Sequence, residues 1–179
     1  MAKARSRGFR CGTCGRVHAG LPTDWGFREP DDVFALSYIE KYLRTRINAD
    51  LCTLDESRYF LRGCLSLPFS EANGEFGWGV WVEVSRDHHD VYAAEVLRDT
   101  EGEPPVQYRL EGRIANSIPG YRATLGLTVD VLLGAAGQRP SLWLPSRSRH
   151  TLAREQARGI SAARHHQLLE ACGYFGESG

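Results

Sequence analysis

The sequence has no apolar run long enough to cross a membrane, no excess of either charge and no repeated or low-complexity segment. A membrane-spanning helix needs about 20 consecutive apolar residues, so this class of protein is excluded. The first twelve residues are basic, but the apolar segment of a secretory signal does not follow them. We therefore expect a cytoplasmic protein, in which cysteines stay reduced and are available as metal ligands.

Several sequence motifs that indicate a catalytic or phosphate-binding site are also absent. There is no glycine-rich phosphate loop, no nucleophile elbow, no His-Glu-x-x-His and no paired-carboxylate signature. The 22 basic and 22 acidic side chains give zero net charge. Residues 1–23 and 139–166 are rich in arginine, but a neutral chain is not expected to bind nucleic acid tightly, and we expect these arginines to be solvated.

The chain of 179 residues, 42% hydrophobic and 25% charged, has the composition of one soluble domain. At this size about 70% of the unfolded surface is buried on folding, so a core forms without disulfides. We expect a basic tail over residues 1–8 and a single domain over 9–175, with a small zinc-binding unit, the knuckle, over 9–20.

Apolar periodicity predicts an α+β fold. Helical spacing predicts a helix over 31–47 with one apolar stripe and with Asp31 or Asp32 as its N-cap. Alternation predicts strands over 51–54, 59–69, 76–84, 106–115 and 125–133, and a strand over 141–144 that pairs back antiparallel. Further helices are expected over 85–97 and, after residue 150, in two pieces separated at Gly159, with Ser161 capping the second. The predicted class is a mostly antiparallel sheet with flanking helices.

The segment CGTCGRVH, residues 11–18, is the strongest local signal. Cys11 and Cys14 are each followed by glycine, and His18 comes four residues after the second cysteine. Zinc prefers thiolate and imidazole ligands in a tetrahedron, and glycines let backbone N–H groups approach the sulfurs. A thioredoxin-type redox pair would need a helix where Gly15 stands. The spacing therefore predicts a structural zinc held by Cys11, Cys14 and His18.

The fourth zinc ligand must come from elsewhere in the chain. We favour Cys52, because it follows the predicted first helix at the start of a strand, where the chain can return to the knuckle. Cys64 lies in the middle of a strand, which is typical of a small core residue. The histidine pairs 88–89 and 165–166 lie on predicted helices and are expected to face solvent. The candidates are Cys52, Cys64, Cys172, His88, His89, His150, His165, His166 and nearby carboxylates.

Arg62 interrupts an otherwise apolar strand, so a buried guanidinium there needs a partner. We expect an ion pair with Asp50, Asp55 or Glu83; the alternative is an anion anchor. Trp78 and Trp81 are expected to point to opposite faces of their strand, one of them into the core. For the other, a core position is favoured over a surface patch. Candidates for a ligand or partner site are Arg62, Trp78, Trp81, Asn116, Arg139 and His150.

Several blocks together resemble a bacterial family of unknown function, number 2199 in the domain-of-unknown-function series. The blocks are CGTCGRVHAGLP, DLCTLDESRYFLRGCLSLP, FGWGVWVEVS, NSIPGY, GQRP and LAREQARGIS. The resemblance spans about residues 9–170. It implies cysteines matching Cys11, Cys14 and Cys52 and a histidine matching His18, which favours Cys52 as fourth ligand. It implies no activity.

We therefore predict a cytoplasmic zinc-knuckle protein that binds a protein partner or a small ligand. The first alternative is an enzyme, either with an open zinc on Cys11, Cys14 and His18 or with a pocket near Arg62 and His150. The second is nucleic-acid binding through the knuckle and the basic ends, which the neutral charge makes unlikely.

Overall fold

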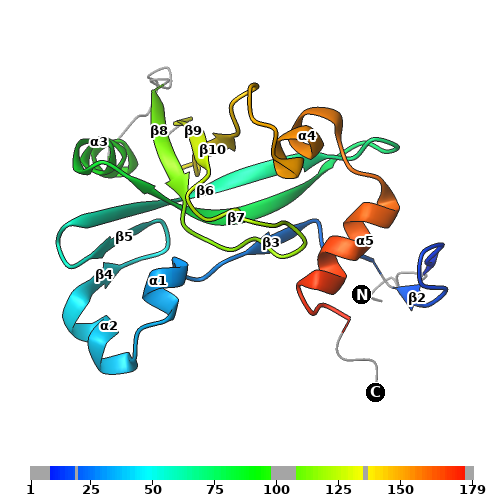
Figure 1. Ribbon diagram of the computed structural model, residues 1–179, viewed down its shortest axis with the longest axis horizontal. Helices are drawn as coiled ribbons and strands as arrows, with labels where there is room; N and C mark the ends of the chain where they lie inside the picture. The colour runs from blue at the N-terminus through cyan, green and yellow to red at the C-terminus, as the bar shows by residue number, and fades with distance from the viewer. Residues whose placement is uncertain (1–8, 19, 98–107, 135–136, 176–179) are drawn as a thin grey trace, which may run out of the picture.

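The computed structural model describes residues 9–18, 20–97, 108–134 and 137–175 (Figure 1). The basic tail expected over residues 1–8 lies outside them. The strands are β1 (Phe9–Arg10), β2 (Val17–His18), β3 (Asp24–Gly26), β4 (Thr45–Ile47), β5 (Leu51–Leu54), β6 (Arg58–Pro68), β7 (Glu75–Val84), β8 (Arg109–Ile114), β9 (Thr128–Leu132) and β10 (Ser141–Trp143). The helices are α1 (Asp31–Phe34), α2 (Tyr38–Arg44), α3 (Arg86–Leu97), α4 (Thr151–Arg158) and α5 (Ala162–Ala171).

The strands β6 to β10 close into a barrel. Antiparallel pairs join β6 to β7, β7 to β8, β8 to β9 and β9 to β10. The ring closes through a parallel pair between β10 and β6, at Ser141 and Cys64. Strand direction can alternate all the way round a ring only if the number of strands is even, so a ring of five must contain a parallel pair.

The α+β class with flanking helices is confirmed, and the expectation of a mostly antiparallel sheet is corrected to a mixed, closed one. The strand 141–144 does pair antiparallel with β9, as predicted, but its second edge pairs in parallel with β6. A further parallel pair attaches β3 to β7 outside the ring. On the other side, β5 and β4 extend the sheet beyond β6 (Figure 1).

Alternate residues of the barrel strands point inward and form the main core, which α3, α4 and α5 complete with Tyr92, Leu152, Leu168 and Leu169. Gly63 leaves room for this closure, because a Cβ there would lie 2.7 Å from the side chain of Leu142 on β10. A second, smaller cluster lies outside the barrel, between α1 and the strands β5–β7. Its members are Val33, Cys52, Leu54, Phe60 and Trp81.

Trp78 and Trp81 point to opposite faces of β7, as the sequence predicted, but both are fully buried. Trp78 fills the barrel, and Trp81 belongs to the second cluster, where its indole N–H donates to the backbone oxygen of Phe27 at 3.3 Å. Core positions for both were the favoured expectation, and the alternative of a surface patch is not borne out, because Val33 of α1 and Phe27 pack against Trp81 on the outer face of β7.

The single helix expected over 31–47 is replaced by α1, α2 and β4. Ser37 starts the second helix through a capping box: its hydroxyl accepts from the backbone N–H of Glu40, and the Glu40 carboxylate accepts from the backbone N–H of Ser37. Val33 of α1 is buried, whereas α2 buries none of its residues. Most of the apolar side chains of the predicted stripe are thus exposed.

The C-terminal helices follow the sequence prediction. Gly159 ends α4 with a φ of 86°, a value that favours glycine, and the hydroxyl of Ser161 accepts from the backbone N–H of Arg164 at the start of α5. None of the described helices combines the length and the apolar character that a membrane span requires.

Asn116 ties the segment before α1 to the barrel. Its side chain is fully buried, and its Oδ1 accepts from the backbone N–H of Trp81 at 2.8 Å. Its Nδ2 donates at 3.0 Å to the backbone oxygen of Glu29 and to a carboxylate oxygen of Asp31. Since both ends of the amide are engaged within the fold, Asn116 is a structural residue and not the ligand contact that the sequence suggested.

We expect Asn116→Ala to lower the free energy of unfolding by about 2–3 kcal/mol, because it leaves the buried N–H of Trp81 without its acceptor. Urea denaturation followed by tryptophan fluorescence measures the change. The control is Asn73→Ala, at an exposed turn residue, which should stay within about 0.5 kcal/mol of the parent protein. Equal stabilities of the two variants would contradict the structural role of Asn116.

Candidate functional site

Four side chains that could bind a metal ion meet at one end of the molecule, and we call them the metal-binding group. Cys11, Cys14 and His18 come from the β1–β2 hairpin, and His166 comes from α5. One ligand atom of each lies within 4.8 Å of those of the others, so the four lie close enough to bind one metal ion. The structure thus brings together the three knuckle residues singled out in the sequence and adds a histidine 148 positions after His18.

The turn between β1 and β2 places the two sulfurs together. The backbone N–H of Cys11 donates to the oxygen of Arg16 at 2.7 Å, and that of Gly15 donates to the oxygen of Cys11 at 2.8 Å. Gly15 has a φ of 70°, a backbone conformation that residues with a Cβ rarely adopt. The Cys14 sulfur lies 3.3 Å from Nε2 of His18. Hydrogen bonding from the backbone of Cys14 lowers the pKa of Cys11, which favours the thiolate that metals bind.

His166 is the most informative member of the group. Its ring is buried, and neither ring nitrogen has a hydrogen-bond partner among the described residues. The ring stacks on Phe175, with centroids 4.3 Å apart and planes inclined by 16°, which fixes its orientation. Leaving a buried polar group unsatisfied costs about 1–3 kcal/mol. A metal ion bound to one of the two nitrogens would remove much of this cost.

Cys52 does not join the metal-binding group, and this corrects the expected fourth ligand. It lies on β5 opposite Phe60, fully buried in the second cluster. In Figure 1, β5 and β2 lie at opposite ends of the long axis. Burial raises the pKa of the Cys52 thiol to about 12, which disfavours the thiolate. The chain does not return to the knuckle after α2 but continues into the β4–β5 hairpin.

The histidine pair 165–166 was expected to face solvent, and both residues are buried. His165, Leu168 and Leu169 have the spacing of one helix face, and this pattern was the available signal that the pair packs inward. His165 is held by a contact of 2.8 Å between its Nε2 and the backbone oxygen of Pro22, and burial lowers its pKa. Among the described residues, the other candidate ligands stay apart from the metal-binding group.

A second candidate site lies at the opposite end of the molecule, on and around α2. Six large apolar side chains there are between 45% and 86% exposed, and we call this surface the α2 face. On α2 they occupy positions 38, 39, 42 and 43, which form one side of the helix. The members of the α2 face are Phe34, Tyr38, Ile39, Tyr42, Leu43 and Ile47.

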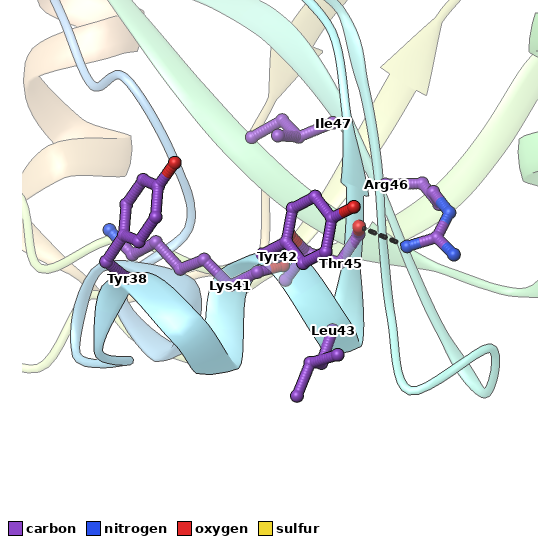
Figure 2. Close-up of a pocket in the computed structure, with 7 residues that line it drawn as sticks. All are labelled: Tyr38, Lys41, Tyr42, Leu43, Thr45, Arg46 and Ile47. Atoms are coloured by element: carbon purple, nitrogen blue, oxygen red, sulfur yellow. Dashed lines mark hydrogen bonds between the residues drawn. The ribbon is translucent and has the colours of Figure 1, made fainter.

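The α2 face contains a pocket of about 610 Å³ (Figure 2). In Figure 2, Tyr38 and Tyr42 rise from the same side of α2, with Ile47 of β4 above them and Leu43 below. Two cationic residues, Lys41 and Arg46, also line the pocket, together with Thr45, and none of the described residues that line it is acidic.

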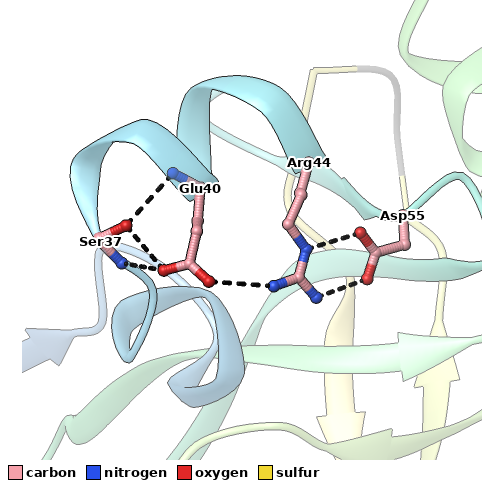
Figure 3. A network of polar contacts seen from close by, with 4 residues as sticks. All are labelled: Ser37, Glu40, Arg44 and Asp55. Atoms are coloured by element: carbon pink, nitrogen blue, oxygen red, sulfur yellow. Dashed lines mark hydrogen bonds and ion pairs between the residues drawn. The ribbon is translucent and has the colours of Figure 1, made fainter.

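Polar contacts hold α2 in place although it buries nothing (Figure 3). Nε and Nη2 of Arg44 each donate to a carboxylate oxygen of Asp55 at 2.8 Å. Nη1 of Arg44 also lies 3.5 Å from Oε1 of Glu40. Glu40 in turn completes the capping box with Ser37. A further ion pair of 2.8 Å joins Lys41 to Glu29. The helix therefore presents its apolar side from a fixed position.

His150 is used by the fold. It is the N-cap of α4: its Nδ1 accepts from the backbone N–H of Leu152 at 3.1 Å, and its Nε2 lies 2.6 Å from the backbone oxygen of Arg122. An adjacent hollow of about 400 Å³ is lined by this histidine and by Arg122 and Arg149. Because both ring nitrogens are engaged, the structure does not support His150 as a free acid or base.

Arg62 does not form the expected ion pair. No hydrogen bond or ion pair joins its side chain to another described residue, and its Nε is buried without a partner. The three carboxylates proposed for it are taken by other arginines. These pairs are Asp50 with Arg139 at 2.6 Å, Asp55 with Arg44 at 2.8 Å and Glu83 with Arg58 at 2.7 Å.

Comparison with known proteins places residues 10–160 in one family model, which is described as an uncharacterized protein conserved in bacteria (DUF2199). This confirms the resemblance seen in the sequence blocks. Neither the curated proteins nor the solved structures contain a match to the chain.

Proposed function

The chain belongs to this uncharacterised bacterial family, and we propose that it is a zinc-stabilised binding protein that holds a segment of a partner protein on its α2 face. The observation that carries the proposal is the exposure of six large apolar side chains on and around a helix that buries none of its own residues. Contiguous apolar surface of this kind is typical of interaction sites, because water contact with it is unfavourable.

The rigidity of the α2 face supports this role. Ion pairs and the capping box hold the helix from both ends, so its aromatic side chains are presented without a large loss of backbone freedom on binding. Tyrosine is enriched at protein interfaces, where its ring packs and its hydroxyl remains hydrogen-bonded. Tyr38 and Tyr42 both line the pocket and are largely exposed, so their rings are available to a partner.

The charges around the pocket favour an apolar segment that carries a carboxylate. Lys41 is already paired with Glu29. Arg46 is exposed, donates only to the backbone oxygen of Thr45, and has no carboxylate partner among the described residues. A carboxylate on the occupant would complete a charge-assisted hydrogen bond with Arg46 while apolar side chains fill the pocket.

The metal in this account is zinc, held by two thiolates and two imidazoles. Four protein ligands make a closed tetrahedral site of the structural type, whereas a catalytic zinc keeps a position for water or substrate. The nearness of His166 to Cys11, Cys14 and His18 therefore favours a structural role over the enzyme alternative. Bound zinc would join the β1–β2 hairpin to α5.

Protein purified without added metal should contain about one zinc per chain. His166→Ala should weaken zinc binding by more than the roughly 10–100-fold that outer-sphere partners contribute, because it removes a ligand. Elemental analysis and competition with a chromophoric chelator measure occupancy and affinity. Cys52→Ala is the matched control and should leave both unchanged. If Cys52→Ala lost zinc and His166→Ala kept it, the fourth ligand would be Cys52 and the assignment of His166 would be wrong.

Peptides selected from a random phage-displayed library on the purified protein should combine apolar residues with Asp or Glu. Their affinity, measured by fluorescence anisotropy, should fall at least about tenfold for the double variant Tyr42→Ser/Leu43→Ser, because central aromatic contacts dominate interfaces. Leu125→Ser removes an exposed leucine outside the α2 face and should bind like the parent protein.

Selected peptides that are rich in Lys or Arg, or that bind the double variant undiminished, would contradict the proposed occupant. Sedimentation velocity adds a separate outcome. A dimer of the parent protein that the double variant loses would assign the α2 face to a second copy of this chain and would overturn the peptide-binding proposal.

A further inference from the structure

The side chain of Arg62 lies across the outer wall of the barrel. It starts on β6, and its Nη2 lies 3.4 Å from the position that a Cβ on Gly79 of β7 would take. The same nitrogen lies 2.5 Å from the corresponding position on Gly26 of β3. The guanidinium therefore rests on a floor of two adjacent glycines, which the parallel pairing of β3 with β7 sets side by side.

The charges around this guanidinium do not balance. Arg139 lies close enough to act on Arg62, and a single carboxylate, that of Asp50, serves the two. Burial of the guanidinium, and then the charge of Arg139, lower the pKa of Arg62, while Asp50 acts in the opposite direction. Two guanidinium groups and one carboxylate leave one positive charge without a partner among the described residues.

We propose that Arg62 binds the carboxylate of a small molecule on this glycine floor. A carboxylate matches the planar fork of a guanidinium and can accept two hydrogen bonds from it. Its single negative charge would also balance the one positive charge that Arg62 and Arg139 together have in excess of Asp50. This site is separate from the metal-binding group and from the α2 face, and it does not depend on the function proposed for either.

A hollow of about 270 Å³ that includes Cys64 has room for the rest of the ligand. Cys64 lies opposite Gly79 in the strand register and close enough to Arg62 to act on its charge, although Arg62 itself does not line the hollow. The wall is partly polar and partly apolar, with Ser66, Ser141, Trp143 and Glu75, whose carboxylate accepts from the Ser66 hydroxyl at 2.8 Å. The ligand class is therefore a short carboxylic acid, with its carboxylate at Arg62 and its chain in the hollow.

Titration of the ¹⁵N-labelled full-length protein with acetate and butanoate, at constant ionic strength, tests the site. Saturable shifts are expected at the backbone amides of Gly26, Gly79 and Cys64, with butanoate binding more tightly than acetate because its chain enters the hollow. Arg62→Gln should weaken binding at least about tenfold, since hydrogen bonds to a charged group are lost.

Two glycine variants provide a matched pair that keeps the charge of Arg62. In Gly26→Ala the new methyl group must displace the end of the flexible Arg62 side chain, so the fold is retained and binding should fall as in Arg62→Gln. In Gly77→Ala the methyl group would meet only a backbone oxygen of Thr23 at 3.9 Å, and binding should persist.

Butanamide and inorganic phosphate complete the test. Butanamide has the shape of butanoate without its charge and should bind far more weakly. Equal binding of the two, or unchanged butanoate affinity in both Arg62→Gln and Gly26→Ala, would overturn the site. Tighter binding of phosphate than of either carboxylate would overturn the assignment to a carboxylic acid.

Discussion

The closure of an odd-numbered ring of strands is the constraint on which the rest of the structure depends. Because five strands cannot alternate in direction, β10 must meet β6 in parallel, and the one-residue contact between Ser141 and Cys64 completes the barrel. Once the ring is closed, the inward residues are committed to the core. The features with chemical character, namely the metal-binding group, the α2 face and Arg62, all lie outside the ring.

A metal ion bound by the metal-binding group would compensate for the weakness of the hairpin that carries three of its members. The strands β1 and β2 have two residues each, and an isolated hairpin of this size is marginal in water. The buried ring of His166 approaches the hairpin from α5 with both nitrogens unpaired among the described residues. One metal ion would satisfy a buried polar group and fix the hairpin to the helix at the same time, a role that needs no open coordination position.

Local signals in the sequence were sufficient for most of the strands and for the C-terminal helices. Alternation located β6 and β7, and Gly159 and Ser161 marked the junction between α4 and α5. Ring closure could not be predicted, because the parallel β10–β6 pair joins residues far apart in sequence. The apolar stripe over 31–47 was identified, but its exposure and the break into α1, α2 and β4 were not. Periodicity shows that one side of a helix is apolar and does not show what covers it.

The part of the candidate metal site that lies within one short segment of the chain could be predicted from the sequence. Three of the four clustered side chains, Cys11, Cys14 and His18, lie within one short turn and were singled out from spacing alone. The fourth member of the group depended on tertiary structure. A thiol such as Cys52 suits zinc well, but Cys52 lies in the second cluster, whereas His166 lies beside the knuckle residues. X-ray absorption spectroscopy at the zinc edge of the full-length protein tests this assignment most directly. We expect two sulfur atoms at about 2.3 Å and two nitrogen atoms at about 2.0 Å from zinc. A shell with three sulfur atoms, or with an oxygen in place of one nitrogen, would contradict it.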